Sequence, residues 1–240
     1  MTEPFIIAIE TSGRSGSVAL ARGGDLLGQC PFSTQTEHAR ELLPALQKIQ
    51  EDTGVVASAV RQCYLSIGPG SFTGLRVAVT FARHLALACG AKIVAVPTLS
   101  VIARACADLA DPPSPLAVIL DAKRGQVFGT VFRFSGGAYA EEQPPRVTRP
   151  AELLSHPSGS VSVMGEGVEY HPDAVAAVGA RVVDRALWTP TAANVHQLGW
   201  PMAQAGQFTA ARDLVPLYLR RPEAEEVWER RERERTDRGA

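Results

Sequence analysis

The sequence predicts an α/β protein of two lobes, each built on a mixed β-sheet flanked by helices. Its length of 240 residues suits two lobes of about a hundred residues each. An apolar run at 5–9 ends in Glu10 and returns, through a turn with glycines, as a second apolar run at 17–21. Residues 116–134 repeat this plan around Asp121. The repetition indicates a duplicated architecture, and the unbroken apolar runs are typical of strands buried on both faces.

The first lobe is expected to begin as a three-stranded meander and to continue as helix, strand, helix and strand. Pro44 must begin or kink part of the first helix. The expected elements are strands at 5–9, 17–21 and 26–30, a helix around 39–49, a strand at 63–67, a helix from Gly74 to Gly90, and a strand at 92–96.

The second lobe is less regular after its opening hairpin. Its expected elements are a helix at 99–109, strands at 116–120, 126–134, 161–164 and 180–183, and a helix at 191–205 that Pro201 interrupts. We therefore predict lobes at 1–98 and 99–222. Residues 223–240 are dominated by Glu and Arg and predict a charged tail, helical or disordered.

Composition excludes several classes of protein. A formal net charge of −1 is not typical of a protein that grips nucleic acid by itself. The cysteines are widely spaced and unsuited to a disulfide framework or a zinc site; they are Cys30, Cys63, Cys89 and Cys106. The opening residues 1–4 lack a basic region, and charged residues interrupt the apolar stretch at 77–96. We expect a cytoplasmic protein.

The loop from Gly68 to Gly74 joins a strand to a helix, as phosphate-binding loops do. It lacks their pattern, since Thr73 replaces a third glycine and Leu75-Arg76 follows where a P-loop needs Lys and Ser or Thr. The loop therefore favours a tight turn that positions the helix.

Two carboxylates at strand ends allow a magnesium site. Glu10, with Thr11 and Ser12, and Asp121 from the second lobe could surround a hydrated metal and a phosphate. These residue types are also common in turns, and no general base accompanies them. Both interpretations stay open on the sequence. No helical His pair and no nucleophile with an adjacent base is visible, so a catalytic set is not predicted.

Four segments together resemble one known family, TsaB, a subunit of the bacterial machinery that makes threonylcarbamoyladenosine next to the tRNA anticodon. They are 6–12 with 16–20, 68–76, 119–128 and 216–225. The most specific is 68–76, Gly-Pro-Gly-Ser-Phe-Thr-Gly-Leu-Arg. The resemblance spans about residues 5–225. It implies an actin-like, sugar-kinase-like fold with two lobes.

The sequence lacks residues that the resemblance would lead one to expect at a metal or phosphate site. TsaB is similar to TsaD, the subunit that transfers the threonylcarbamoyl group and binds a metal through two histidines. The corresponding positions here are Thr98 and Ile102. The family's usual residue at position 10 is Asp, whereas this chain has Glu10. Any site formed by Glu10, Thr11, Ser12 and Asp121 is therefore expected to be vestigial, and no metal site is expected.

The resemblance implies a non-catalytic scaffold that binds TsaD, with TsaE joining and TsaC supplying the activated adenylate. It implies no cofactor of its own, leaves room for ATP or ADP and magnesium in the assembled complex, and implies tRNA contact only through that complex. The chain alone is expected to form a homodimer. The predicted interface residues are His38, Leu42, Leu43, Leu46, Gly74, Ala78, Ala82 and Ala86.

Alternatives remain at this point. The small stripe of Gly74, Ala78, Ala82 and Ala86 could equally pack on its own sheet. The rival function is an independent ATP-dependent small-molecule kinase that uses Glu10 and Asp121 around magnesium.

Overall fold

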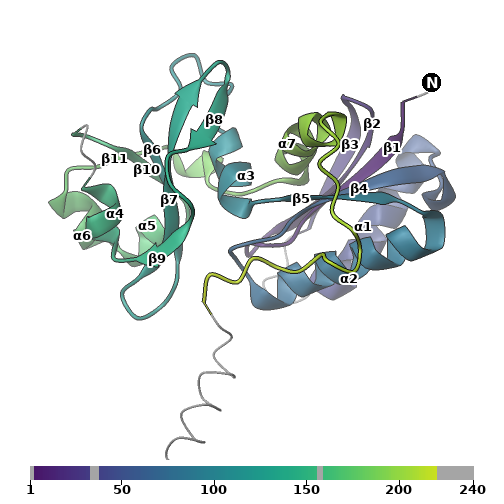
Figure 1. Cartoon of the computed structure of the whole chain (residues 1–240), viewed down its shortest axis with the longest axis horizontal. Helices are drawn as coiled ribbons and strands as arrows, with labels where there is room; N and C mark the ends of the chain where they lie inside the picture. Colours follow the sequence, from purple (N-terminus) through teal and green to yellow (C-terminus); the bar gives the residue numbers. More distant parts are fainter. Residues whose placement is uncertain (1–2, 33–37, 156–158, 221–240) are drawn as a thin grey trace, which may run out of the picture.

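The computed structural model describes residues 3–32, 38–155 and 159–220. It contains two β-sheets, one in each of two lobes that lie side by side (Figure 1). Helix α3, Thr98–Arg104, follows the last strand of the first sheet and leads into the second lobe.

The first sheet has the strand order β3-β2-β1-β4-β5. β2 pairs antiparallel with β1 and β3, whereas β4 lies parallel to β1 and β5 parallel to β4. The strands are β1 Phe5–Glu10, β2 Gly16–Arg22, β3 Asp25–Phe32, β4 Val60–Ser66 and β5 Lys92–Val96. The predicted meander and the two later strands are confirmed.

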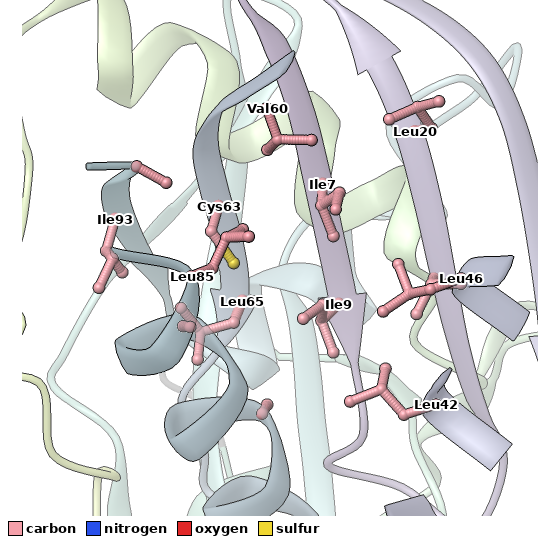
Figure 2. Packing of buried hydrophobic residues seen from close by; sticks show 14 of the residues in the cluster. Ile7, Ile9, Leu20, Leu42, Leu46, Val60, Cys63, Leu65, Leu85 and Ile93 are labelled. Atoms are coloured by element: carbon pink, nitrogen blue, oxygen red, sulfur yellow. The ribbon is translucent and has the colours of Figure 1, made fainter. Parts of the chain in front are cut away.

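Helices cover both faces of this sheet. α1, His38–Thr53, and α2, Phe72–Cys89, pack on one face, and α7, Ala192–Gln204, packs on the other (Figure 1). Alternation along β1 assigns the faces: Ile7 and Ile9 point toward α1 and α2, as Figure 2 shows, while their neighbours Ile6 and Ala8 belong to the α7 side.

The second sheet repeats this topology. Its order, β11-β10-β6-β7-β8, read backwards gives a meander of β6, β7 and β8 followed by the parallel strands β10 and β11. β9 pairs with β7. The strands are β6 Leu116–Asp121, β7 Val127–Ser135, β8 Ala138–Glu141, β9 Arg146–Thr148, β10 Ser162–Met164 and β11 Arg181–Val182. The duplicated architecture predicted from the sequence is confirmed.

Short helices cover the second sheet. α4 Pro150–Leu154, α5 Gly167–Tyr170 and α6 Pro172–Ala177 contribute to one face, and α3 covers the other. Single turns of 3-10 helix lie at Ala57–Ala59 and Arg185–Leu187. Along β6, Ala117 and Ile119 face the first group, whereas Leu116 and Val118 face α3.

The C-terminal part of the predicted second lobe packs on the first lobe. The predicted second lobe, 99–222, includes α7, whose Ala192 and Val195 belong to the core of the first sheet. Leu214 is also fully buried on the first lobe, on the face covered by α1 and α2. The chain therefore returns to the first lobe after the second sheet is complete. The predicted tail at 223–240 lies outside the described residues.

In the part of the chain that the structure describes, every helix is too short or too polar to cross a lipid bilayer.

Candidate functional site

Glu10, at the end of β1, is turned into the protein. Its side chain has no exposed surface, and its Oε1 accepts hydrogen bonds from the backbone N–H and the hydroxyl of Ser12. Its Oε2 and the neighbouring Ser66 Oγ are buried without a hydrogen-bond partner among the described residues. Burial raises the pKa of Glu10 by more than the hydrogen bonds from Ser12 and the proximity of the Ser66 hydroxyl lower it. These surroundings favour the neutral acid.

Thr11 is likewise occupied by an internal contact. It is fully buried, and its hydroxyl donates a hydrogen bond of 2.8 Å to the carbonyl of Gly74 in the first turn of α2. Ser12 accepts a backbone hydrogen bond of 2.7 Å from Ser71, the residue that caps α2. These bonds fix the turn after β1 against the start of α2.

Asp121, at the equivalent end of β6, is also engaged. Lys123 Nζ lies 2.9 Å from its Oδ2, and His171 Nε2 lies 3.3 Å from its Oδ1. Burial raises the pKa of Asp121, but the hydrogen bonds and the charge of Lys123, with the His171 contact, outweigh it and lower the pKa below its ordinary value. Asp121 is therefore a carboxylate that already has cationic and hydrogen-bonding partners.

The two strand ends meet at a cleft of about 520 Å³ between the lobes. Ser12 and Asp121 both line it, together with Gly70 and Lys123, while Glu10 is shut away behind Ser12. The residues present do not fit a magnesium–nucleotide site held by Glu10 and Asp121, because the first is enclosed and the second is engaged. Bound ATP or ADP with magnesium in an assembled complex stays a prediction.

Side chains from both lobes bridge this cleft. Arg14, from the turn after β1, donates to the hydroxyl of Tyr170 on α5 and lies 3.9 Å from the carboxylate of Glu166. Lys123 lies 5.2 Å from the centre of the Tyr170 ring. Burial raises the pKa of Glu166 although the Arg14 charge lowers it. All four side chains line the cleft.

The glycine loop after β4 shapes the start of α2. A Cβ on Gly70 would lie 2.4 Å from the carbonyl oxygen of Ser12, so only glycine permits this approach. Ser71 caps the helix, because its hydroxyl accepts a hydrogen bond from the backbone N–H of Gly74. The interpretation of this loop as a turn that positions the helix is confirmed, and α2 begins at Phe72, two residues earlier than expected.

Much of the predicted interface lies inside the chain's own core. Gly74, Ala78 and Ala82 are buried, and Ala78 and Ala82 pack in the core between α2 and the first sheet. Leu42 and Leu46 of α1 are buried in the same core, as Figure 2 shows. The prediction of an interface is therefore corrected for Gly74, Ala78, Ala82 and Leu46, since the close approach that the small stripe permits is to their own sheet. Leu42 is buried too, but it also lines the groove described below.

The remaining predicted interface residues lie differently. Leu43 is 63% exposed, and Ala86 is half-buried beside the core. His38 is the first residue of α1, and its side chain lies outside the described part. Leu43 is thus the predicted residue that the structure places clearly at the surface.

An apolar groove of about 660 Å³ runs between α1 and α2 beside Leu43. Its lining is mostly apolar, with Arg76 and His84 as charged or titratable members. The lining residues are Ala39, Leu42, Leu43, Phe72, Thr73, Arg76, Val77, Thr80, Phe81 and His84. Sequence reasoning assigned α2 to the interface through its small stripe and missed the face that lines the groove, although Phe72, Val77 and Phe81 are apolar positions outside that stripe and could have indicated it.

The positions that correspond to the metal-binding histidines of TsaD are enclosed as well. Thr98 is buried, and its hydroxyl accepts a hydrogen bond of 3.0 Å from the N–H of Gly68. Ile102 is fully buried in the core of the second lobe. Within 3–32, 38–155 and 159–220, no group of three or more His, Cys, Asp or Glu side chains is placed to hold a metal ion.

The duplicated sheets and the cleft between them define a protein of the actin-like, sugar-kinase-like class. A family model described as TsaD, tRNA N6-adenosine threonylcarbamoyltransferase, matches residues 24–228. The chain belongs to this family, and it is similar to relatives named TsaB along most of its length.

Those relatives match along most of their length. The tRNA threonylcarbamoyladenosine biosynthesis protein TsaB of Escherichia coli is 29% identical, over 90% of this chain and 94% of its own. The Bacillus subtilis protein of the same name is 28% identical, over 93% and 97%. A solved structure named YeaZ, from Pseudomonas aeruginosa, superimposes with a TM-score of 0.78 at 26% identity and covers 90% of this chain and all of its own.

Proposed function

We propose that this chain is a non-catalytic scaffold subunit in the synthesis of threonylcarbamoyladenosine in tRNA. Relatives named for that biosynthesis support the pathway. The enclosed Glu10 and the substituted positions Thr98 and Ile102 support a role without chemistry of its own. Among the described residues, no feature of the cleft favours the kinase alternative.

The groove between α1 and α2 is the surface that we propose for a TsaD-type partner. Leu43 is 63% exposed and Phe72 36% exposed at this groove, beside the apolar side chains of Val77 and Phe81. A groove bounded by two helices suits a helix or helix pair of the partner, which would complete a bundle with α1 and α2. The groove is the observation that carries the proposal.

The same groove can serve a second copy of this chain when the partner is absent. Two copies related by a twofold axis would present identical grooves to each other, which is the usual geometry of homodimers. Binding of TsaD would then replace the dimer. In this scheme TsaE joins the assembly, and tRNA is contacted through the complex.

The test measures binding of the purified chain to the TsaD subunit of the same genome by calorimetry and size-exclusion chromatography with light scattering. Leu43→Glu places a charge in the groove and should weaken binding at least about a hundredfold. Leu87→Glu is the matched control, since Leu87 lies on α2, is 83% exposed and does not line the groove. Equal binding by both variants would reject the groove, and absence of binding by the unaltered chain would reject the scaffold role.

A further inference from the structure

The segment 211–220, called here the C-terminal strap, is fastened to the first lobe. Arg83 of α2 donates two hydrogen bonds to strap carbonyls, including one of 2.7 Å to that of Leu214, whose side chain is buried. The backbone N–H of Leu217 donates to the carbonyl of Ile67 at 2.7 Å. In Figure 1 the strap is the yellow-green chain that leaves α7, passes α2 and reaches the second lobe.

The glycine loop is shaped to receive this strap. Gly68 has φ +109°, and a Cβ at this position would lie 2.9 Å from the carbonyl oxygen of Leu217. Both the backbone angle and the close approach require glycine. Gly68 therefore allows the strap backbone to approach the loop closely, as Gly70 does for the turn after β1.

The other end of the strap is fastened to the second lobe. The guanidinium of Arg220 donates to the carbonyl of Ala122 and to the side-chain oxygen of Gln126, both at the turn between β6 and β7. Asp121 and Lys123 of the cleft belong to the same turn. Movement of the lobes relative to each other must therefore shift the strap or break one of its two attachments.

The middle of the strap continues the proposed partner groove. The ring centre of Tyr218 lies 5.3 Å from that of Phe72, and its hydroxyl accepts a hydrogen bond of 3.4 Å from Arg76. The Arg76 guanidinium lies 3.7 Å from the centre of the Phe72 ring. Phe72 and Arg76 both line the groove, and Tyr218 is 40% exposed. Tyr218 thus adjoins the groove through its contacts with Phe72 and Arg76.

We propose that Tyr218 is part of the surface on which the TsaD-type partner docks, and that docking is coupled through the strap to the β6–β7 turn at the interlobe cleft. This inference rests on the proposed function. A partner that binds Tyr218 while Arg220 is bonded to the β6–β7 turn stabilises the arrangement of the lobes in which those bonds form. The bonds of Arg220 to the β6–β7 turn are called here the clamp. By linkage, the clamp strengthens partner binding by the same factor by which the bound partner stabilises the clamp. A change that breaks the clamp must therefore weaken partner binding.

The docking part is tested by Tyr218→Ala, which should weaken binding of the TsaD subunit about tenfold, and by Tyr218→Phe, which keeps the ring and should bind normally. Equal binding by Tyr218→Ala and the unaltered chain would remove Tyr218 from the docking surface.

The coupling is tested with Arg220→Gln, which releases the clamp away from the groove. Binding of the TsaD subunit should weaken about tenfold, whereas Arg212→Gln, a change at an exposed strap arginine, should leave it unaltered. Hydrogen exchange measured by mass spectrometry supplies the second readout. Docking on the unaltered chain should slow exchange in residues 122–126, and Arg220→Gln should abolish that protection.

The outcomes separate the two proposals. If the unaltered chain does not bind TsaD, the proposed function and this inference both fail. If it binds and Arg220→Gln binds equally well, the coupling alone fails. Protection of 122–126 that persists in Arg220→Gln also overturns the coupling, because the partner then touches the turn directly. Should Arg220→Gln not fold, Gln126→Ala removes an acceptor from the other side of the clamp and tests the same prediction.

Discussion

Replacement of Glu10 by Gln tests whether the buried acid is neutral in the folded protein. Its pKa is raised above the ordinary value of 4.5, so folding retains a proton that the unfolded chain releases as pH rises. The stability that Glu10 contributes is therefore complete below about pH 4.5 and is lost as pH rises toward its folded pKa. Each pH unit in that interval lowers the free energy of unfolding by about 1.4 kcal/mol.

Gln cannot titrate, and it keeps the shape of the protonated acid. Its carbonyl can accept the two hydrogen bonds from Ser12, and its amide group replaces Oε2 beside Ser66. Glu10→Gln should thus unfold within about 1 kcal/mol of the unaltered chain near pH 5. Its relative stability should then rise by about 1.4 kcal/mol per pH unit for as long as Glu10 stays neutral in the folded chain.

Urea denaturation at several pH values between 5 and 8 measures this difference, and all other titrating groups cancel in it. Glu51→Gln, at an exposed position on α1, is the control for the loss of a carboxyl group at the surface. If the stability curves of Glu10→Gln and the unaltered chain run parallel over this range, Glu10 is ionised in the fold and the argument against a metal-binding role for it fails.

Three further changes test the site. Ala82→Arg forces a long cation into a fully buried position and should lower the free energy of unfolding by about 3 kcal/mol or more. The measurement is Tm, which should fall steeply. Any loss of partner binding in this variant would then follow from loss of folding. Gly70→Ala should cost about 1–3 kcal/mol in urea denaturation, because its Cβ meets the carbonyl oxygen of Ser12 at 2.4 Å; unchanged stability would contradict that close approach. Lys123→Met should raise the pKa of Asp121 in a carbon-13 NMR titration, since burial then acts with less opposition; an unchanged pKa would assign the lowering to another group.

The fold was largely predictable because its strands carry strong local signals. Apolar runs such as 5–9 and 116–120 are buried on both faces, and tight turns separate them from their returning partners. The repetition of that plan identified two equivalent sheets. The return of α7 to the first lobe was not predictable, because chain order carries no information about which of two similar sheets a late helix covers.

The candidate site was predictable in its residues and not in their orientation. An acid at the end of a strand can face a cleft or the core, and the sequence around Glu10 is compatible with both. Only the contacts with Ser12 decide that it faces inward. The stripe of Ala78 and Ala82 posed the same problem, because small residues permit a close approach to any backbone, whether in the same chain or in another.

The assignment of that stripe to the core strengthens the case for a partner. Helix α2 buries its small residues, Gly74, Ala78 and Ala82, and leaves Phe72 36% exposed at the groove. Leu75, Val79 and Leu85 of α2 are buried as well, so the helix covers its own sheet with large residues and still leaves Phe72 at the groove. The small residues bring α2 close to the sheet, and a second set of apolar residues, Phe72, Val77 and Phe81, lines the groove on the other side. That arrangement makes physical sense when a second surface covers the groove, and the Leu43→Glu experiment asks whether it is the surface of TsaD.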